Sequence, residues 1–283
     1  MKKLLTIIIS ATLLSTMMTG FTVKTATLPT PETSSVSAVV IDAQTGKILY
    51  AKNAYEVRAM ASLTKVMTTI LTLEAGDLDR RFKVDNGAIH VEGTTMGLRE
   101  DDVVTRRALC YGMMLPSGND AANASAVSVS GSVGEFVTLM NTKARQIGMT
   151  DTQFANPHGL DQANHHSTAY DMAVLTAYAL TRSDESATFR EIAATQSVRT
   201  EFGNPPYRRW LSNNNKLLHM YEGCIGVKTG FTDNARRCLI TAAQRDGRTL
   251  IAVTLNAPDD WNDHIKMYNY GFTKIGMLYK NYE

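Results

Sequence analysis

The stretch from Ile225 to Asn256, IGVKTGFTDNARRCLITAAQRDGRTLIAVTLN, decides the fold. Within it, residues 226–230, 238–244 and 249–256 form three short apolar segments, each bounded by turn-forming residues. Short apolar segments with this spacing are typical of neighbouring antiparallel strands. This part of the chain therefore predicts a sheet.

Outside this stretch, the start and the middle of the chain show different patterns. Residues 36–42 and 47–52 are two apolar segments split by a polar turn, which predicts a β-hairpin. The order of strands, helices, strands and a last helix predicts an α+β fold, in which both chain ends build one antiparallel sheet and a helical subdomain is inserted between them. Ser167 is the expected N-cap of one helix. The expected helices are 63–75, 106–115, 120–130, 134–147, 168–181 and 259–276.

The N-terminus predicts export. Residues 1–3 give a basic start, and residues 4–18 are uncharged and mostly apolar. This run is shorter than the roughly 20 apolar residues that a membrane span needs, which favours a signal peptide over residues 1–26. Because Lys24 stands where cleavage sites carry a small residue, an uncleaved anchor stays open, and with it membrane attachment. The protein is expected outside the cytoplasm, in the cell wall or periplasm.

The domain organisation follows from the composition after this signal. Residues 27–35 are rich in Pro, Thr and Ser and are expected to form a linker. One main domain is expected over residues 36–276, with its helical subdomain at about 76–195. The chain ends at Glu283, shortly after the last predicted helix, so we expect no C-terminal β domain.

Charge and cysteine content exclude several classes of protein. The formal net charge is +2, and three of the lysines lie in the predicted signal, so the mature chain is close to neutral. No basic stripe is visible, and nucleic acid is therefore not an expected partner. Three cysteines cannot form a fully paired framework within one molecule. Cys110 and Cys238 lie in apolar segments and are expected to be buried thiols.

Three short motifs carry the chemistry. They are Ser62–Lys65 (Ser-Leu-Thr-Lys), Ser117–Asn119 (Ser-Gly-Asn) and Lys228–Gly230 (Lys-Thr-Gly). Each alone has a simpler explanation: Ser62, and Ser117 or Asn119, could be helix N-caps, and Lys228–Gly230 could be the end of a strand before a turn. All three in this order, in one exported domain, predict a serine acyl-transfer site that uses lysine as its base.

A lysine base requires a particular environment. If Ser62 begins a helix, Lys65 lies one turn further on the same face, and its amine can reach the hydroxyl. Lysine is a base only when neutral, although its free pKa is about 10.4. Burial and a neighbouring cation both favour the neutral amine. We therefore expect Lys65 to be the base and Lys228 to be a fixed positive charge beside it.

The motifs and their flanks resemble those of the D-alanyl-D-alanine carboxypeptidases, which are low-molecular-weight penicillin-binding proteins of the serine peptidase type. The likeness extends over about residues 36–272. It implies a β-lactamase/transpeptidase-like fold, an antiparallel sheet flanked by helices beside a helical subdomain, with the site between them. The matching segments are 61–65 (ASLTK), 115–122 (LPSGNDAA), 154–160 (FANPHGL) and 227–232 (VKTGFT).

The resemblance also implies a reaction. Ser62 attacks the carbonyl between the last two D-alanines of a peptidoglycan stem peptide, Lys65 takes the proton, and Ser117 relays a proton to the leaving amine. The N–H groups of Ser62 and Phe231 form the oxyanion hole, and water clears the acyl-enzyme. A β-lactam acylates the same serine and stalls. No metal or other cofactor is implied, and the implied substrate-binding residues are Asn119, Lys228, Thr229, Gly230, Phe231 and Thr232.

The chain departs from its relatives in two places. Some relatives carry an arginine after the penultimate strand that grips the substrate carboxylate, whereas residues 259–264 (DDWNDH) contain none. We therefore expect Thr229, Thr232 and Lys228 to bind the carboxylate. Arg236 stands where relatives often have glycine.

Four other functions share some of these sequence features. A DD-endopeptidase acting on cross-links and a β-lactam sensor without turnover keep the same serine, so both stay open. A class A β-lactamase is disfavoured because this chain has Gly118 where that class has an acidic residue, and no Glu-x-x-Leu-Asn. A metal peptidase is disfavoured because His158, His165 and His166 form no His-Glu-x-x-His motif.

Overall fold

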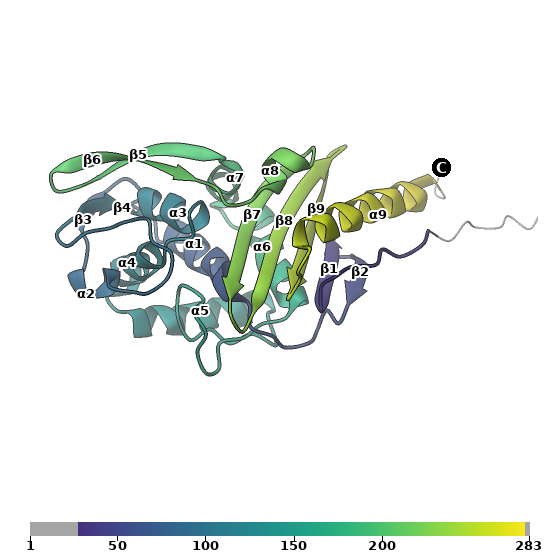
Figure 1. Ribbon diagram of the computed structural model, residues 1–283, viewed down its shortest axis with the longest axis horizontal. Helices are drawn as coiled ribbons and strands as arrows, with labels where there is room; N and C mark the ends of the chain where they lie inside the picture. The colour runs from purple at the N-terminus through teal and green to yellow at the C-terminus, as the bar shows by residue number, and fades with distance from the viewer. Residues whose placement is uncertain (1–27, 281–283) are drawn as a thin grey trace, which may run out of the picture.

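A five-stranded antiparallel sheet forms the centre of the molecule, with the strand order β2-β1-β9-β8-β7 (Figure 1). The computed structural model describes residues 28–280, and the predicted signal peptide lies outside them. Among the described helices, none combines the length and hydrophobicity needed to cross a bilayer. Both ends of the chain build the sheet, as predicted, through β1 (Ser37–Asp42), β2 (Ile48–Lys52), β7 (Cys224–Thr232), β8 (Arg236–Arg245) and β9 (Arg248–Leu255).

Both faces of the sheet are covered. Alternate residues of a strand point to opposite faces, and in β1 all of them are buried. On one face, Val40 packs in a cluster with Tyr268 of α9 (Asp260–Lys280). On the other face, Val39 belongs to the main core, together with α1 (Lys65–Glu74) and α6 (Ala169–Thr181). This two-sided burial explains why the strand segments are continuously apolar instead of alternating.

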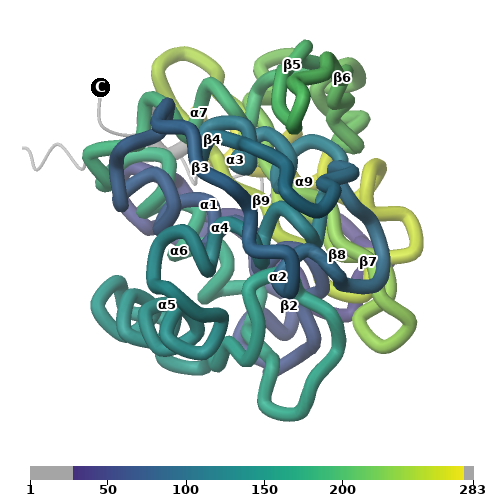
Figure 2. Tube along the Cα trace, turned by 90° about the vertical axis from the view of Figure 1, so that its left-hand side faces the viewer, coloured from purple at the N-terminus to yellow at the C-terminus, as the bar shows by residue number. Residues whose placement is uncertain are grey.

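The helical part lies beside the sheet, and Figure 2 shows α3, α4 and α5 on the side that faces the viewer. The remaining elements of this part are small: α2 (Asn86–Ile89), and a two-stranded sheet of β3 (Arg81–Lys83) and β4 (Val103–Thr105). Its main helices are α3 (Arg106–Met114), α4 (Asn119–Ser130), α5 (Val133–Ile147) and α7 (Ser186–Ala194).

Side-chain caps fix where these helices begin. The Thr105 hydroxyl caps α3 and the Ser132 hydroxyl caps α5, each accepting a hydrogen bond from a backbone N–H three residues on. The predicted cap of α6 was wrong by one residue. Thr168 accepts the bond from the backbone N–H of Asp171, because Ser167 instead forms an isolated bridge with Arg58.

A long hairpin, β5 (Ser197–Gly203) and β6 (Pro206–Ser212), has no counterpart among the predicted strands. It packs on α3 and β4 and extends away from the main sheet (Figure 1). Its inward positions include the buried Phe202 and Leu211, whereas Arg208 and Trp210 on the outer face are exposed. Because charged residues on the outer face interrupt the sequences of β5 and β6, these strands lack the continuous apolar segments from which the other strands were predicted. The hairpin leads through α8 (Leu217–Met220) into β7.

Candidate active site

Ser62 lies in a single tight turn that leads into α1. The sequence predicted an α-helix from Ser62 onward, but residues Ala61–Thr64 form a 3₁₀ turn, and the α-helix begins at Lys65. Residues three apart eclipse each other in a 3₁₀ turn, which aligns Ser62 with Lys65 more closely than an α-helix does. The Nζ of Lys65 lies 2.9 Å from the Oγ of Ser62.

Lys65 is fully buried and has three polar neighbours. Besides Ser62, its Nζ donates to the Asn119 Oδ1 and to the His158 carbonyl oxygen, both at 2.6 Å. Burial, and secondly the charge of Lys228, hold the Lys65 pKa well below its ordinary value. A neutral amine has two N–H groups and one lone pair. Asn119 and His158 accept the two N–H groups, and the lone pair is left for the hydroxyl proton of Ser62, as a base requires.

Lys228 lies on β7, at one end of the strand order. Its side chain is 1% exposed, and its Nζ donates to the Thr229 carbonyl at 2.8 Å. Burial lowers the pKa of Lys228 to about 7. The sequence predicted a permanent positive charge on Lys228, whereas with this pKa the charge of its amine depends on pH near neutrality.

Strand β7 runs close against the turn that holds Ser62. A Cβ atom added at Gly230 would lie 3.1 Å from the Ser62 nitrogen, so any larger residue would force the strand or the turn to shift by a few tenths of an ångström. Phe231 follows and is 60% exposed. The backbone of this strand and the backbone N–H of Ser62 therefore border the same space.

The middle motif closes the site from the helical part. Ser117 has φ +69 in the turn before α4, and Asn119 is the first residue of that helix. While the Oδ1 of Asn119 accepts from Lys65, its Nδ2 donates to the Glu92 carbonyl at 2.7 Å. Asn119 therefore positions the lysine in this structure, a contact that the sequence did not predict beside its expected substrate role.

The backbone around Ser62 is supported by the loop at residues 154–160, a segment that matches the family and for which the sequence predicted no role in the site. The Oδ1 of Asn156 accepts from the backbone N–H of Gly159 at 2.7 Å, which shapes the loop that presents the His158 carbonyl. His165 accepts from the backbone N–H of Ala155, so its Nε2 carries the proton and donates to Thr64 at 2.8 Å. Burial lowers the pKa of His165 to about 4, consistent with this neutral form.

A cleft of about 380 Å³ opens above these groups. Ser62, Ser117, Thr229, Gly230 and Phe231 line it, whereas Lys65, Asn119 and Lys228 are buried. Thr232 is differently placed: its Oγ1 donates to Asp161 at 2.9 Å and accepts from the Ala235 N–H. The structure thus brings eight of the nine predicted residues to one cleft or directly around Lys65 and Ser62, and directs Thr232 elsewhere.

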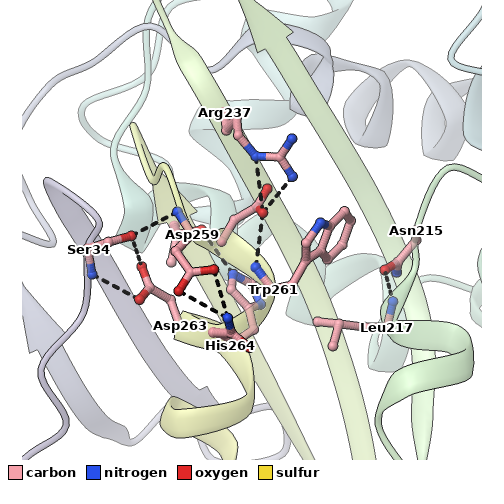
Figure 3. Close-up of polar contacts among 11 residues, drawn as sticks. Ser34, Asn215, Leu217, Arg237, Asp259, Trp261, Asp263 and His264 are labelled. Carbon is pink, nitrogen blue, oxygen red and sulfur yellow. Dashed lines mark hydrogen bonds and ion pairs between the residues drawn. The ribbon is translucent and has the colours of Figure 1, made fainter.

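Six residues of the cleft lining were missed by the site prediction: Thr94, Asn214, Lys216, Arg237, Asp260 and Trp261. Arg237 and Trp261 lie close together at one side of it (Figure 3). Arg237 donates to Asp260 Oδ1 through Nη2 at 2.6 Å and Nε at 3.2 Å. The sequence contained a signal, since Arg237 follows an unusual Arg236, and Asp260 and Trp261 lie in the segment where some relatives carry an arginine. The link between the two segments is visible only in three dimensions.

The cysteines are where the sequence placed them. Cys110 and Cys238 are buried free thiols, and burial raises the pKa of both; for Cys238 it rises to about 12. A thiol that resists ionisation is a poor nucleophile. Ser62 therefore has no competitor among them.

Comparison with known proteins agrees with this geometry. The family model described as D-alanyl-D-alanine carboxypeptidase (peptidase S11) matches residues 22–259. The D-alanyl-D-alanine carboxypeptidase DacF of Bacillus subtilis is 36% identical over 84% of the chain, and the match spans 62% of that protein's length. The D-alanyl-D-alanine carboxypeptidase of Streptomyces sp. strain K15 is 32% identical over 94% of the chain and 97% of its own length.

A solved structure gives the same result. The crystal structure of the Streptomyces K15 DD-transpeptidase superposes with a TM-score of 0.81 at 31% identity, covering 87% of this chain and all of that one. The predicted α+β, transpeptidase-like fold is therefore confirmed. From the family model, the relatives and the fold together, the chain belongs to the D-alanyl-D-alanine carboxypeptidase family.

Proposed function

We propose that the protein is a serine D-Ala-D-Ala carboxypeptidase, which removes the terminal D-alanine from peptidoglycan stem peptides through an acyl-enzyme on Ser62. One observation carries the proposal. The buried amine of Lys65 lies 2.9 Å from the Ser62 hydroxyl at the floor of an open cleft, and its lowered pKa suits a base. Family membership supports the substrate class.

In the first step, Ser62 attacks the carbonyl carbon of the penultimate D-alanine, and Lys65 takes the hydroxyl proton. The developing oxyanion accepts hydrogen bonds from the backbone N–H groups of Ser62 and Phe231. The close approach of β7 to Ser62 at Gly230 supports this pairing. Donors fixed by the fold need no reorganisation when the charge develops.

In the second step, the bond between the two D-alanines breaks, and the leaving amine takes a proton through Ser117. The position of Ser117 on the cleft wall supports this role. Lys228 stabilises the negative charge of the occupied site. Water then attacks the acyl-enzyme, with Lys65 again as base, and Ser62 is regenerated.

A β-lactam follows the first step and stops before the second, so Ser62 becomes stably acylated. The enzyme acts outside the cytoplasmic membrane, where its peptidoglycan substrate is assembled. The basic start and the uncharged run at residues 4–18 support this location. Roles for the six implied substrate-binding residues are part of the same proposal, with Thr232 the least supported because Asp161 occupies its hydroxyl.

The test combines intact-protein mass spectrometry after exposure to benzylpenicillin, peptide mapping, and an assay of D-alanine release. Wild type should gain one penicilloyl group on the peptide that contains Ser62 and should release D-alanine from a stem peptide. Ser62→Ala should do neither, whereas Ser132→Ala, which removes the cap of α5 and changes no residue of the cleft lining, should do both. D-alanine release by Ser62→Ala would point to another nucleophile.

The same experiment separates the two functions left open by the sequence. A sensor would be acylated without releasing D-alanine. An endopeptidase would also cut a cross-linked muropeptide dimer, which is therefore included as a second substrate.

A further inference from the structure

The proposed substrate ends in a carboxylate, so the cleft should contain a matching donor near Thr229. Two of the three groups expected to bind it are poorly available. Thr232 donates to Asp161, and Lys228 is buried with its Nζ on a backbone carbonyl. The remaining cations of the cleft lining are Arg237 and Lys216.

Arg237 lies diagonally across from Thr229 on the neighbouring strand. In the register of β7 and β8, Arg237 pairs with Phe231, and Leu239 pairs with Thr229. Side chains two residues apart on a strand share a face, so Arg237 and Thr229 project to the same side of the sheet. Both residues line the cleft that contains Ser62.

Asp260 holds the guanidinium in one orientation. A single carboxylate oxygen, Oδ1, accepts from Nε and Nη2 of Arg237, and it also accepts from the Trp261 N–H (Figure 3). The Asp260 side chain is 3% exposed, and the Arg237 side chain is 43% exposed. The guanidinium carbon lies 5.6 Å from the centre of the Trp261 ring. One side of the arginine is therefore fixed and the other is open.

A count of N–H groups shows what remains for a ligand. A guanidinium has five N–H donors, and Asp260 takes two of them. Among residues 28–280, the remaining three have no hydrogen-bond partner. They include both N–H groups of Nη1 and one of Nη2, the edge that binds a carboxylate with two parallel hydrogen bonds.

We propose that Arg237 binds the terminal carboxylate of the substrate, with Thr229 beside it, and that Asp260 is the residue that positions the guanidinium. This assignment rests on the proposed function. It gives the chain a carboxylate anchor on β8, in place of the arginine that is missing from residues 259–264. A purely structural ion pair between β8 and α9 would not require an open donor edge in the cleft of the nucleophile.

The test compares a peptide ending in D-Ala-D-Ala with the same peptide as its C-terminal amide, using kcat/KM and acylation of Ser62 as readouts. Loss of two charge-assisted hydrogen bonds should lower kcat/KM of Arg237→Gln on the acid by about 100-fold, and on the amide by no more than about threefold. Arg237→Lys keeps the charge but not the two parallel N–H donors of the guanidinium, so its kcat/KM on the acid should fall by about tenfold. Arg236→Gln and Lys216→Gln are matched controls that should keep the wild-type ratio of acid to amide.

Arg237→Gln leaves the buried Asp260 without its partner and can destabilise the fold. The double variant Arg237→Gln/Asp260→Asn removes both charges, should melt close to wild type, and should show the same loss of discrimination. An unchanged acid-to-amide ratio in a folded single or double variant would overturn the assignment, as would a lost ratio in Lys216→Gln. A wild-type protein that hydrolyses neither peptide would refute the proposed function itself, and this assignment with it.

Discussion

Replacing Lys228 by methionine should make the protein more stable at neutral pH while it destroys acylation. Burial lowers the pKa of this amine from 10.5 to about 7. Between pH 7 and pH 10.5, Lys228 therefore carries a proton in the unfolded chain that it lacks in the folded chain. Stability rises with pH wherever the unfolded state binds more protons, so wild type is penalised at pH 7 and less at higher pH.

The magnitude follows from the pKa difference. At 1.36 kcal/mol per pKa unit, burial of Lys228 lowers the free energy of unfolding by about 4 kcal/mol at pH 7 and by about 1 kcal/mol at pH 9.5. The variant also loses the hydrogen bond from Nζ to the Thr229 carbonyl, worth about 1 kcal/mol. Lys228→Met should therefore exceed wild type by about 3 kcal/mol at pH 7 and match it at pH 9.5.

Urea unfolding followed by circular dichroism at both pH values measures this difference. Thiols and phenols that titrate in the same pH range contribute equally to the stability of both proteins, so their contribution cancels when the variant is compared with wild type. Lys47→Met, at an exposed lysine, is the matched control and should show no pH-dependent difference. A Lys228→Met protein less stable than wild type at pH 7, or an equal difference at both pH values, would refute the reasoning.

Three further predictions concern the site and its support. Lys65→Ala should slow acylation by benzylpenicillin by at least about 1,000-fold, because the hydroxyl loses its base; stopped-flow labelling measures the rate, and a smaller loss would point to another base. Gly159→Ala should cost at least about 3 kcal/mol in thermal unfolding, since φ is +97 and the new Cβ would lie 2.0 Å from the Ala61 carbonyl oxygen. Arg236→Gly should raise stability by up to about 1 kcal/mol, because φ is +58 there, and a lower melting temperature would contradict this.

The sheet and the motif set were predictable because their signals are local. Each strand from residue 225 onward is a short apolar run between turns, and each motif carries its reactive residues within three positions. The spacing from Ser62 to Lys65 already implies contact on one helical face. Even here the local geometry differs, because a 3₁₀ turn precedes α1.

The rest of the site depends on contacts between distant segments. The acceptors on Lys65 come from Asn119 and from the loop at His158, and nothing near Lys65 in the sequence identifies them. Arg237 and Asp260 meet only because α9 begins beside the first residues of β8. The low pKa of Lys228 arises from burial, which no spacing reveals.

The position of β9 between β1 and β8 has a consequence for how a newly made chain reaches its active form. The hairpin of β1 and β2 is synthesised first, yet its neighbour in the sheet, through pairs such as Ser37 with Leu255, is made near the end of synthesis. Such high contact order slows folding, because the entropy of closing a long loop is lost before the strand pairing can stabilise the chain. A nascent chain that stops before β9 should remain sensitive to protease and should not be acylated by penicillin, although Ser62 and Lys65 have already been synthesised.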